Sequence, residues 1–425
     1  MRTALINPIW RAEKFIFSVF IALVFPALAN AQNLLKDFHK ARDFDPTFAA
    51  ARIENQSGEL DAKIARMAYY PSGRASLSQL DNENSDRTTL SITQPIFSYE
   101  KWLTLKEADP KLALAGAKLE QSQYDLAQRL FKAISTLVDA REKLTLNVNN
   151  LTALEAQAQS ARRSFELGMG TITDVRDTEV RLAQLRSQSF VLKAANAAAE
   201  RQYMALVGQA PSAGAYKLKV KLQAFDLPPM QDLMARAEQR NPAMRSNALS
   251  ITLAEIAKRK TLAAFFPSVN AFIQRSQLGG NPAVMNSGMG LRMDIPLQPS
   301  TFFKGASADL DLNKAQELER NTRQQIRLDV ERFYNQLEAV QSELSVRAEA
   351  IKASELSLDA NEQSFTGGVR TKLDVLNALQ AVFQSRADYA SAQLRLGETF
   401  LALLTVSAAD ADAALTQISE LIFAE

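Results

Sequence analysis

Apolar residues follow two different periods along the chain, and the change of period separates helices from strands. From about residue 101 to 167 they recur with the four–three spacing of a heptad repeat, which predicts a long coiled-coil helix whose only interruptions are Pro110, near its start, and Gly116. Residues 72–98 instead alternate apolar and polar side chains, as in a β-hairpin with strands about ten residues long. Residues 32–69 predict a helix interrupted at Asp45-Pro46, and residues 172–207 predict a helix after the long one.

The same order of elements returns about 200 residues later, a period that marks an internal repeat. Asn241-Pro242 corresponds to Asp45-Pro46, and a second alternating segment surrounds the turn residues Gly279 to Pro282. A second long helix is predicted from about residue 303 to 365, with apolar residues at the corresponding seam positions. The chain is therefore a duplication of one unit, made of a helix, two strands, a very long helix, a turn and another helix.

A short motif follows the long helix of each unit, and we call residues 164–175 the first tip and residues 364–375 the second tip. The two tips share Ser, Phe, Gly, Thr, Asp and Val at a constant offset of 200. Glycine supplies the left-handed residue that ends the first helix, and threonine caps the next one. Each tip is therefore predicted to be a helix–turn–helix.

The beginning of the chain has the pattern of a secretory signal peptide. Basic residues come first, an apolar run extends from Phe15 to Leu28, and Ala29-Asn30-Ala31 has the small-x-small pattern of a cleavage site. A retained membrane anchor is the alternative, although the run is short for a membrane-spanning helix. The expected organisation has these parts: signal peptide 1–31, first repeat 32–208, linker 209–229, second repeat 230–405 and C-terminal tail 406–425.

Composition excludes several classes of function. The formal charge of the whole chain is +2, and residues 1–31 carry that excess, so nothing favours nucleic acid as a partner. The chain has no cysteine, which excludes disulfides, thiol chemistry and a cysteine-linked lipid, and its single histidine is His39. No nucleophile–base set, phosphate loop or metal spacing occurs, so neither enzyme activity nor a cofactor is predicted.

The number of strands predicts assembly. Two strands in each of two units give four per chain, whereas the smallest single-chain outer-membrane barrels have about eight. Closure therefore requires several chains, and three would give twelve strands, with the helices continuing as a tube. The predicted fold class is mainly α, with long coiled-coil helices and a four-stranded contribution to a membrane β-barrel.

Three features together resemble the TolC family of outer-membrane efflux and secretion channels over about residues 33–405. They are the strand end Pro95-Ile96-Phe97, the paired Asp-Pro and Asn-Pro helices, and the doubled tips. The resemblance implies a homotrimer with a twelve-stranded barrel in outer-membrane lipid and a helical barrel in the periplasm. It also implies two partners, a periplasmic adaptor (membrane fusion) protein and an inner-membrane transporter driven by ATP (the ABC class) or by protons.

Because it lacks cysteine, the chain is similar to the unlipidated branch of that family, which includes the channels of type I protein secretion and also small-molecule exporters. A periplasmic coiled-coil adaptor or scaffold protein without a membrane barrel is the alternative function. Fractionation discriminates the two, because a channel stays with the outer membrane as a heat-resistant trimer.

The resemblance implies a periplasmic gate formed by the inner helices. Arg370 of the second tip matches the gate arginine, and Thr173 and Asp174 of the first tip match its partners on neighbouring helices. Phe365 occupies the position of a gate tyrosine and lacks its hydroxyl, so either the closed state is weaker or another contact replaces that bond. The alternative role of Arg370 and Asp174 is that of ordinary residues at a helix start.

The resemblance also implies a selectivity constriction and an adaptor contact. Asp374 matches the first of two acidic constriction residues, and Asn377 replaces the second, which predicts a weaker preference for cations. The alternative role of Asp374 is to cap its helix. The alternative for the tips is that each is only a turn between two helices and contacts no adaptor. The contact is expected at the residues of the turns: Gly168, Gly170, Thr171, Gly367, Gly368 and Thr371.

Overall fold

A computed structural model describes residues 31–80, 85–212, 214–220, 222, 225, 227–278, 284–296 and 299–424. Except for Ala31, the predicted signal peptide lies outside the described residues, as do the predicted hairpin turns at residues 81–84 and 279–282. In the described parts of the chain, no helix is both long and apolar enough to cross a membrane.

The first half of the chain forms the predicted unit. Its elements are α1 (Ala31–Phe44), α2 (Pro46–Arg66), the short 3-10 helix η1 (Met67–Tyr69), β1 (Ser72–Leu80), β2 (Ser85–Phe97), α3 (Tyr99–Lys106), α4 (Ala108–Glu166) and α5 (Ile172–Val207). The predicted break before Pro46 is confirmed, because Asp45 caps α2 by accepting a hydrogen bond from the Phe48 N–H at 2.8 Å.

The long helix of this unit is divided at Glu107, close to the interruption expected at Pro110, and it is continuous through Gly116. Pro110 has no N–H to donate to the carbonyl of Lys106, which leaves one helical hydrogen bond unmade. The Glu107 carboxylate instead binds Lys111 at 3.0 Å and Lys260 at 2.8 Å. Burial opposes the ionisation of Glu107, and the hydrogen bonds from the two lysines outweigh it and lower the pKa.

The second half repeats the unit and ends with one further helix. Its elements are α6 (Met230–Arg240), α7 (Pro242–Ala263), β3 (Ser268–Leu278), β4 (Val284–Asp294), α8 (Ser300–Thr366), α9 (Lys372–Val406) and α10 (Ala411–Ile422). The two repeats meet at the sheet, where β2 of the first pairs antiparallel with β3 of the second.

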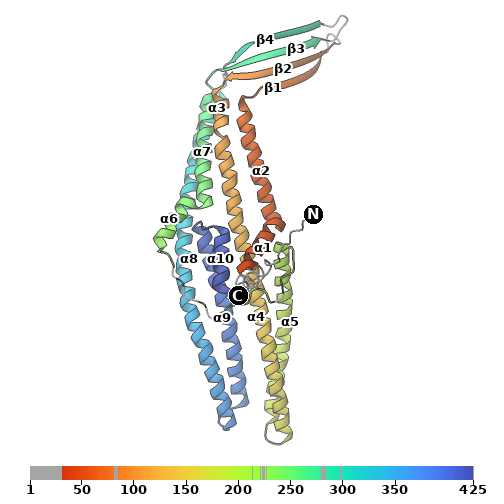
Figure 1. The fold of residues 1–425 in the computed structure, drawn as a ribbon, viewed down its shortest axis with the longest axis vertical. Coiled ribbons are helices and arrows are strands. Elements are labelled where there is room, and N and C mark those ends of the chain that lie inside the picture. The colour runs from red at the N-terminus through yellow and green to blue at the C-terminus, as the bar shows by residue number, and fades with distance from the viewer. Residues whose placement is uncertain are drawn as a thin grey trace, which may run out of the picture.

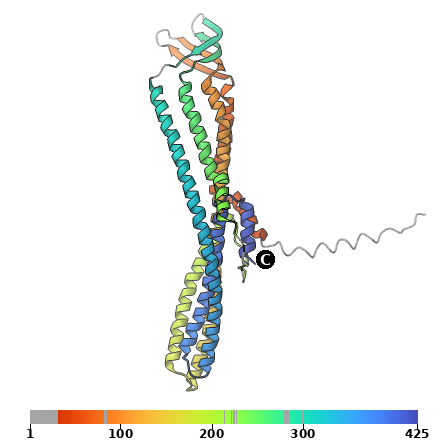
Figure 2. The same ribbon diagram turned by 90° about the vertical axis from the view of Figure 1, so that its left-hand side faces the viewer.

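The four strands form one antiparallel sheet in the order β1-β2-β3-β4. The register places Ile92 opposite Ile273 and Ile273 opposite Met289, so exposed apolar side chains of neighbouring strands lie on one face. The sheet lies at one end of the elongated molecule and both tips lie at the other, as Figures 1 and 2 show.

The apolar core lies near the middle of the molecule, where α4 packs against α9 and α10 (Figure 1). The predicted heptad seam of α4 is buried there, with Leu126, Leu130 and Leu137 fully inaccessible. α10, for which no element was predicted, is part of the same core through Leu415, Ile418 and Ile422. The region is packed closely enough that a Cβ on Gly397 would lie 2.6 Å from the Phe131 ring.

Candidate functional site

The first tip joins α4 to α5 by a turn built from the predicted residues. Gly168 has φ 71°, the left-handed conformation that a glycine adopts without strain, and the Met169 N–H donates to the Ser164 carbonyl at 2.8 Å. Thr171 and Asp174 then form a reciprocal capping box. The Asp174 N–H donates to Thr171 Oγ1 at 3.1 Å, and the Thr171 N–H donates to Asp174 Oδ2 at 3.2 Å.

The second tip has the same construction between α8 and α9. Gly368 has φ 73°, and Thr371 and Asp374 form the second capping box, with distances of 3.3 and 2.9 Å. The hydrogen bonds from Thr371 lower the pKa of Asp374. Asp174 and Asp374 therefore start their helices, and their side chains remain partly exposed at the end of the molecule.

Arg370 lies beside the capping box of its own tip. Its Nη1 atom is 3.9 Å from Asp374 Oδ1, and its side chain is 58 % exposed, so this ion pair is weak. In the described residues of one chain, Arg370 makes no hydrogen bond or ion pair with Thr173 or Asp174. The expected bond to the neighbouring helices stays a prediction.

Phe365 has a partner that the sequence did not indicate. The ammonium of Lys372 lies over the Phe365 ring, 4.8 Å from its centre, as a cation–π contact. Lys372 is half-buried, and this burial lowers its pKa, while the carboxylates of Glu362 and Asp174 act in the opposite direction. The lysine of the second tip is thus within electrostatic reach of the carboxylate of the first tip.

Asn377 also has an unpredicted partner. Arg181 of α5 extends between the hairpins and donates from Nη2 to Asn377 Oδ1 at 2.5 Å and from Nη1 to Gln380 Oε1 at 3.2 Å. Both acceptors are amides on α9, one helical turn apart. The guanidinium therefore connects the two hairpins near their tips, at the level of one predicted constriction residue.

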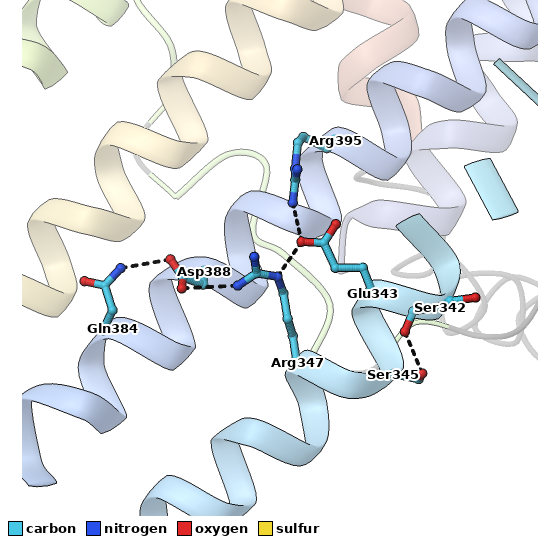
Figure 3. A network of polar contacts seen from close by, with 7 residues as sticks. All are labelled: Ser342, Glu343, Ser345, Arg347, Gln384, Asp388 and Arg395. Atoms are coloured by element: carbon cyan, nitrogen blue, oxygen red, sulfur yellow. Dashed lines mark hydrogen bonds and ion pairs between the residues drawn. The ribbon is translucent and has the colours of Figure 1, made fainter. Parts of the chain in front are cut away.

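Ion pairs hold the two helices of each hairpin together above its tip. Arg186 binds Glu155 at 3.0 Å between α5 and α4, and Arg386 binds Glu355 at 2.6 Å between α9 and α8, again at an offset of 200. A larger network of this kind joins α8 to α9 (Figure 3). Its shared acceptor is Glu343, whose Oε1 receives one hydrogen bond at 2.6 Å from each of Arg347 and Arg395.

Arg347 continues that network to Asp388, two turns before Arg395 on α9, where the Arg347 Nη1 atom lies 3.1 Å from Asp388 Oδ2. The chain of charges ties α8 to α9 over several turns, and an ion-pair network restrains both helices more strongly than an isolated surface pair. Each hairpin is therefore a firm unit, and separation of the tips requires relative movement of the hairpins.

The two residues that the sequence analysis missed, Lys372 and Arg181, both differ from their counterparts in the other repeat. At the offset of 200, Lys372 corresponds to Ile172, and Arg181 corresponds to Ala381. A comparison of the two repeats position by position would have indicated both. Among the described residues, no group of three or more metal-binding side chains occurs.

Comparison with known proteins gives one matching family, described as "Outer membrane efflux protein", over residues 38–209 and 233–409. The alkaline protease secretion protein AprF of Pseudomonas aeruginosa is 25 % identical, over 91 % of this chain and 88 % of the relative. The proteases secretion protein PrtF of Dickeya chrysanthemi is 24 % identical, over 88 % of each chain.

The crystal structure of the outer membrane protein VceC of Vibrio cholerae has the same fold. It superposes with a TM-score of 0.72 at 16 % identity, over 89 % of this chain and 96 % of that one. In the match to the family, residues 38–209 and 233–409 contain both long helices, both tips and all four strands.

Proposed function

Since the chain belongs to the outer membrane efflux protein family, a family of non-enzymatic transport channels that includes TolC, we propose that it forms the exit duct of a type I secretion system. One observation carries this proposal: the four-stranded sheet and the two tips lie at opposite ends of a single long molecule (Figure 1). A sheet at one end suits attachment to a membrane, and tips at the other suit a partner far from it. Protein export is favoured over small-molecule efflux by the similarity to AprF and PrtF, which are named as protease secretion proteins.

Three copies complete the duct. Within the described residues of the chain, β1 and β4 each pair with one neighbouring strand, so the sheet has two open edges. Open edges with long strands associate with further strands. Pairing β1 of one copy with β4 of the next gives a closed sheet of twelve strands from three copies.

The exposed face of the sheet supports contact with lipid. Apolar side chains that lie on this face are between 46 and 83 % exposed in the single chain, and they come from three neighbouring strands. They are Ile92, Ile273, Met289, Leu291 and Met293. A contiguous exposed apolar surface of this kind marks a membrane or protein contact.

The helices carry the duct away from the membrane. α8 has 67 residues, which corresponds to a length of about 100 Å at 1.5 Å per residue. The tips at its far end are the proposed contact with a periplasmic adaptor, whose partner is an inner-membrane transporter. The transporter supplies the energy, and the duct is a passive conduit.

We propose that Lys372 replaces the missing hydroxyl bond of Phe365 in the closed gate. The Phe365 ring positions the ammonium, and the carboxylate of Asp174 on the other hairpin attracts it. The closed state is then held within each chain by a charge attraction, and between chains by the expected bonds of Arg370.

Fractionation of the expressing cells tests the proposed location and assembly. The expected result is recovery in the outer membrane as a trimer that survives mild heating in detergent. Recovery as a soluble monomer in the periplasm would support the alternative of a coiled-coil adaptor or scaffold and would overturn the proposal.

Comparison of a deletion strain with its complemented parent tests the cargo. If the duct serves protein secretion, deletion removes specific proteins from the culture medium, and the complemented strain restores them. A deletion strain with an unchanged secretome but increased sensitivity to small toxic molecules would support efflux instead.

A further inference from the structure

Arg181 is unusual among the arginines near the tips because its polar partners are neutral. Arg186 and Arg386 each bind a glutamate across their own hairpin. Arg181 makes hydrogen bonds to the amide oxygens of Asn377 and Gln380, and it has no ion pair within the described part of the chain, although Asp177 lies one turn earlier on α5. Its positive charge is therefore not matched by a contacting carboxylate.

The position of this charge follows from its hydrogen bonds. Arg181 as a residue is partly buried, and its planar guanidinium donates to two side chains one turn apart on α9. Asn377 is three residues after Asp374, so both lie on one face of that helix. The bond of 2.5 Å to Asn377 thus holds the Arg181 charge beside the face that carries the Asp374 carboxylate.

We infer that Arg181 sets the charge selectivity of the duct at its narrow periplasmic end by opposing the carboxylates there. This inference rests on the proposed function, in which the α9 face with Asp374 and Asn377 lines the mouth of the tube. Each chain contributes one guanidinium, so three chains lower the net negative charge of the mouth by three units. An aspartate at position 377 would neutralise Arg181 by an ion pair, whereas the asparagine leaves its charge free to act on passing ions.

Single-channel recordings in a planar bilayer under a salt gradient test the role of the charge. Arg181→Gln removes the charge and retains a hydrogen-bonding side chain. We expect the ratio of cation to anion permeability to rise about sevenfold, because removal of the charge favours cations and disfavours anions by a little less than threefold each. That magnitude corresponds to the loss of three unit charges about 8 Å from the ion path in screened aqueous solution. Asn377→Asp should raise the ratio in the same direction by pairing with the guanidinium.

Two further variants separate charge from structure. Arg181→Lys keeps the charge and loses the fork, so its ratio should stay near that of the parent protein. The double variant Arg186→Gln, Glu155→Gln is the matched control, because it removes an arginine of the same helix together with its carboxylate partner and leaves the net charge unchanged. Each variant is first shown to form the heat-resistant trimer.

The outcomes distinguish this inference from the proposed function. An unchanged ratio in Arg181→Gln channels, or an equal rise in Arg181→Lys channels, would overturn the role of the Arg181 charge and leave the duct itself intact. If the parent protein forms no channel in the bilayer, the proposed function fails and the selectivity role fails with it.

Discussion

Replacing Lys372 by methionine removes one positive charge from the second tip and keeps most of the length of the side chain. The ammonium lies 4.8 Å from the centre of the Phe365 ring, in a half-buried position within electrostatic reach of Asp174. We expect this variant to open more readily, because the attraction between the hairpins is lost while the fold of each hairpin is retained.

The magnitude follows from the contact that changes on opening. Phe365 and Lys372 belong to the same tip, so the cation–π contact persists when the hairpins separate. The attraction to Asp174 does not persist. The two charges act on each other at longer range than a direct ion pair, and such an attraction in water contributes about 0.5 kcal/mol. Three chains that open together would lose about 1.5 kcal/mol, which is about a tenfold shift of the equilibrium toward the open state.

Single-channel recording measures this shift as the fraction of time in the high-conductance state. Lys372→Arg should retain the closed state, because it keeps a cation that can contact an aromatic ring and a carboxylate. Lys352→Met is a matched control on the same hairpin, since Lys352 is an exposed lysine of α8. An open fraction for Lys372→Met equal to that of the parent and the control would refute the proposed contact.

Three other outcomes are expected. Arg370→Ser should raise single-channel conductance by removing the bonds between copies, and an unchanged conductance would exclude Arg370 from the gate. Asp374→Asn should lower cation selectivity, and an unaltered reversal potential would contradict a role of Asp374 in ion selection. The variant keeps the helix cap, because asparagine retains an oxygen that can accept the hydrogen bond from the Thr371 N–H. Arg129→Met should destabilise the α1–α2 junction by about 3 kcal/mol, because it leaves the buried Asp45 carboxylate, now bonded by Arg129 at 2.7 and 3.1 Å, without its cation. Burial opposes the ionisation of Asp45, but the hydrogen bond and charge of Arg129, together with the hydrogen bonds from the Phe48 and Thr47 N–H groups, outweigh it and lower the pKa. This stability is therefore present above the unfolded pKa, about 4, and is lost as the pH falls through the lower folded value. Protection of residues 45–49 from hydrogen exchange, corrected for intrinsic rates, should fall in the Arg129→Met variant and in the parent protein at low pH. Protection at the start of α7 supplies the reference, because Asn241 caps that helix in the second repeat without an arginine.

Features that depend on neighbouring residues were predictable from the sequence. The capping boxes at Thr171 and Thr371 join residues three apart, and the left-handed residues Gly168 and Gly368 follow from local backbone sterics. The period of apolar residues likewise distinguished the strands from the long helices. The duplication then placed these local features twice, in the same order.

The structure also contains local features that the prediction omitted. α10 carries apolar residues at the helical spacing of Ala411, Leu415, Ile418 and Ile422, yet no element was predicted there. The interruption near Pro110 was expected, but its stabilisation at Glu107 by Lys260, which is far away in the sequence, was not. A pattern within one helix does not reveal such a distant cation.

The contacts between the two hairpins, on which the proposed gate and selectivity roles rest, required the tertiary structure. Arg181 reaches Asn377 across 196 positions of the sequence, and Lys372 approaches Asp174 across a similar separation. Sequence alone determined the repeated unit, because helices, strands and turns follow from short-range sterics and periodic burial. Only packing of α5 beside α9 determined which charges face one another at the tips, because electrostatic partners are set by distance in space and not by spacing along the chain.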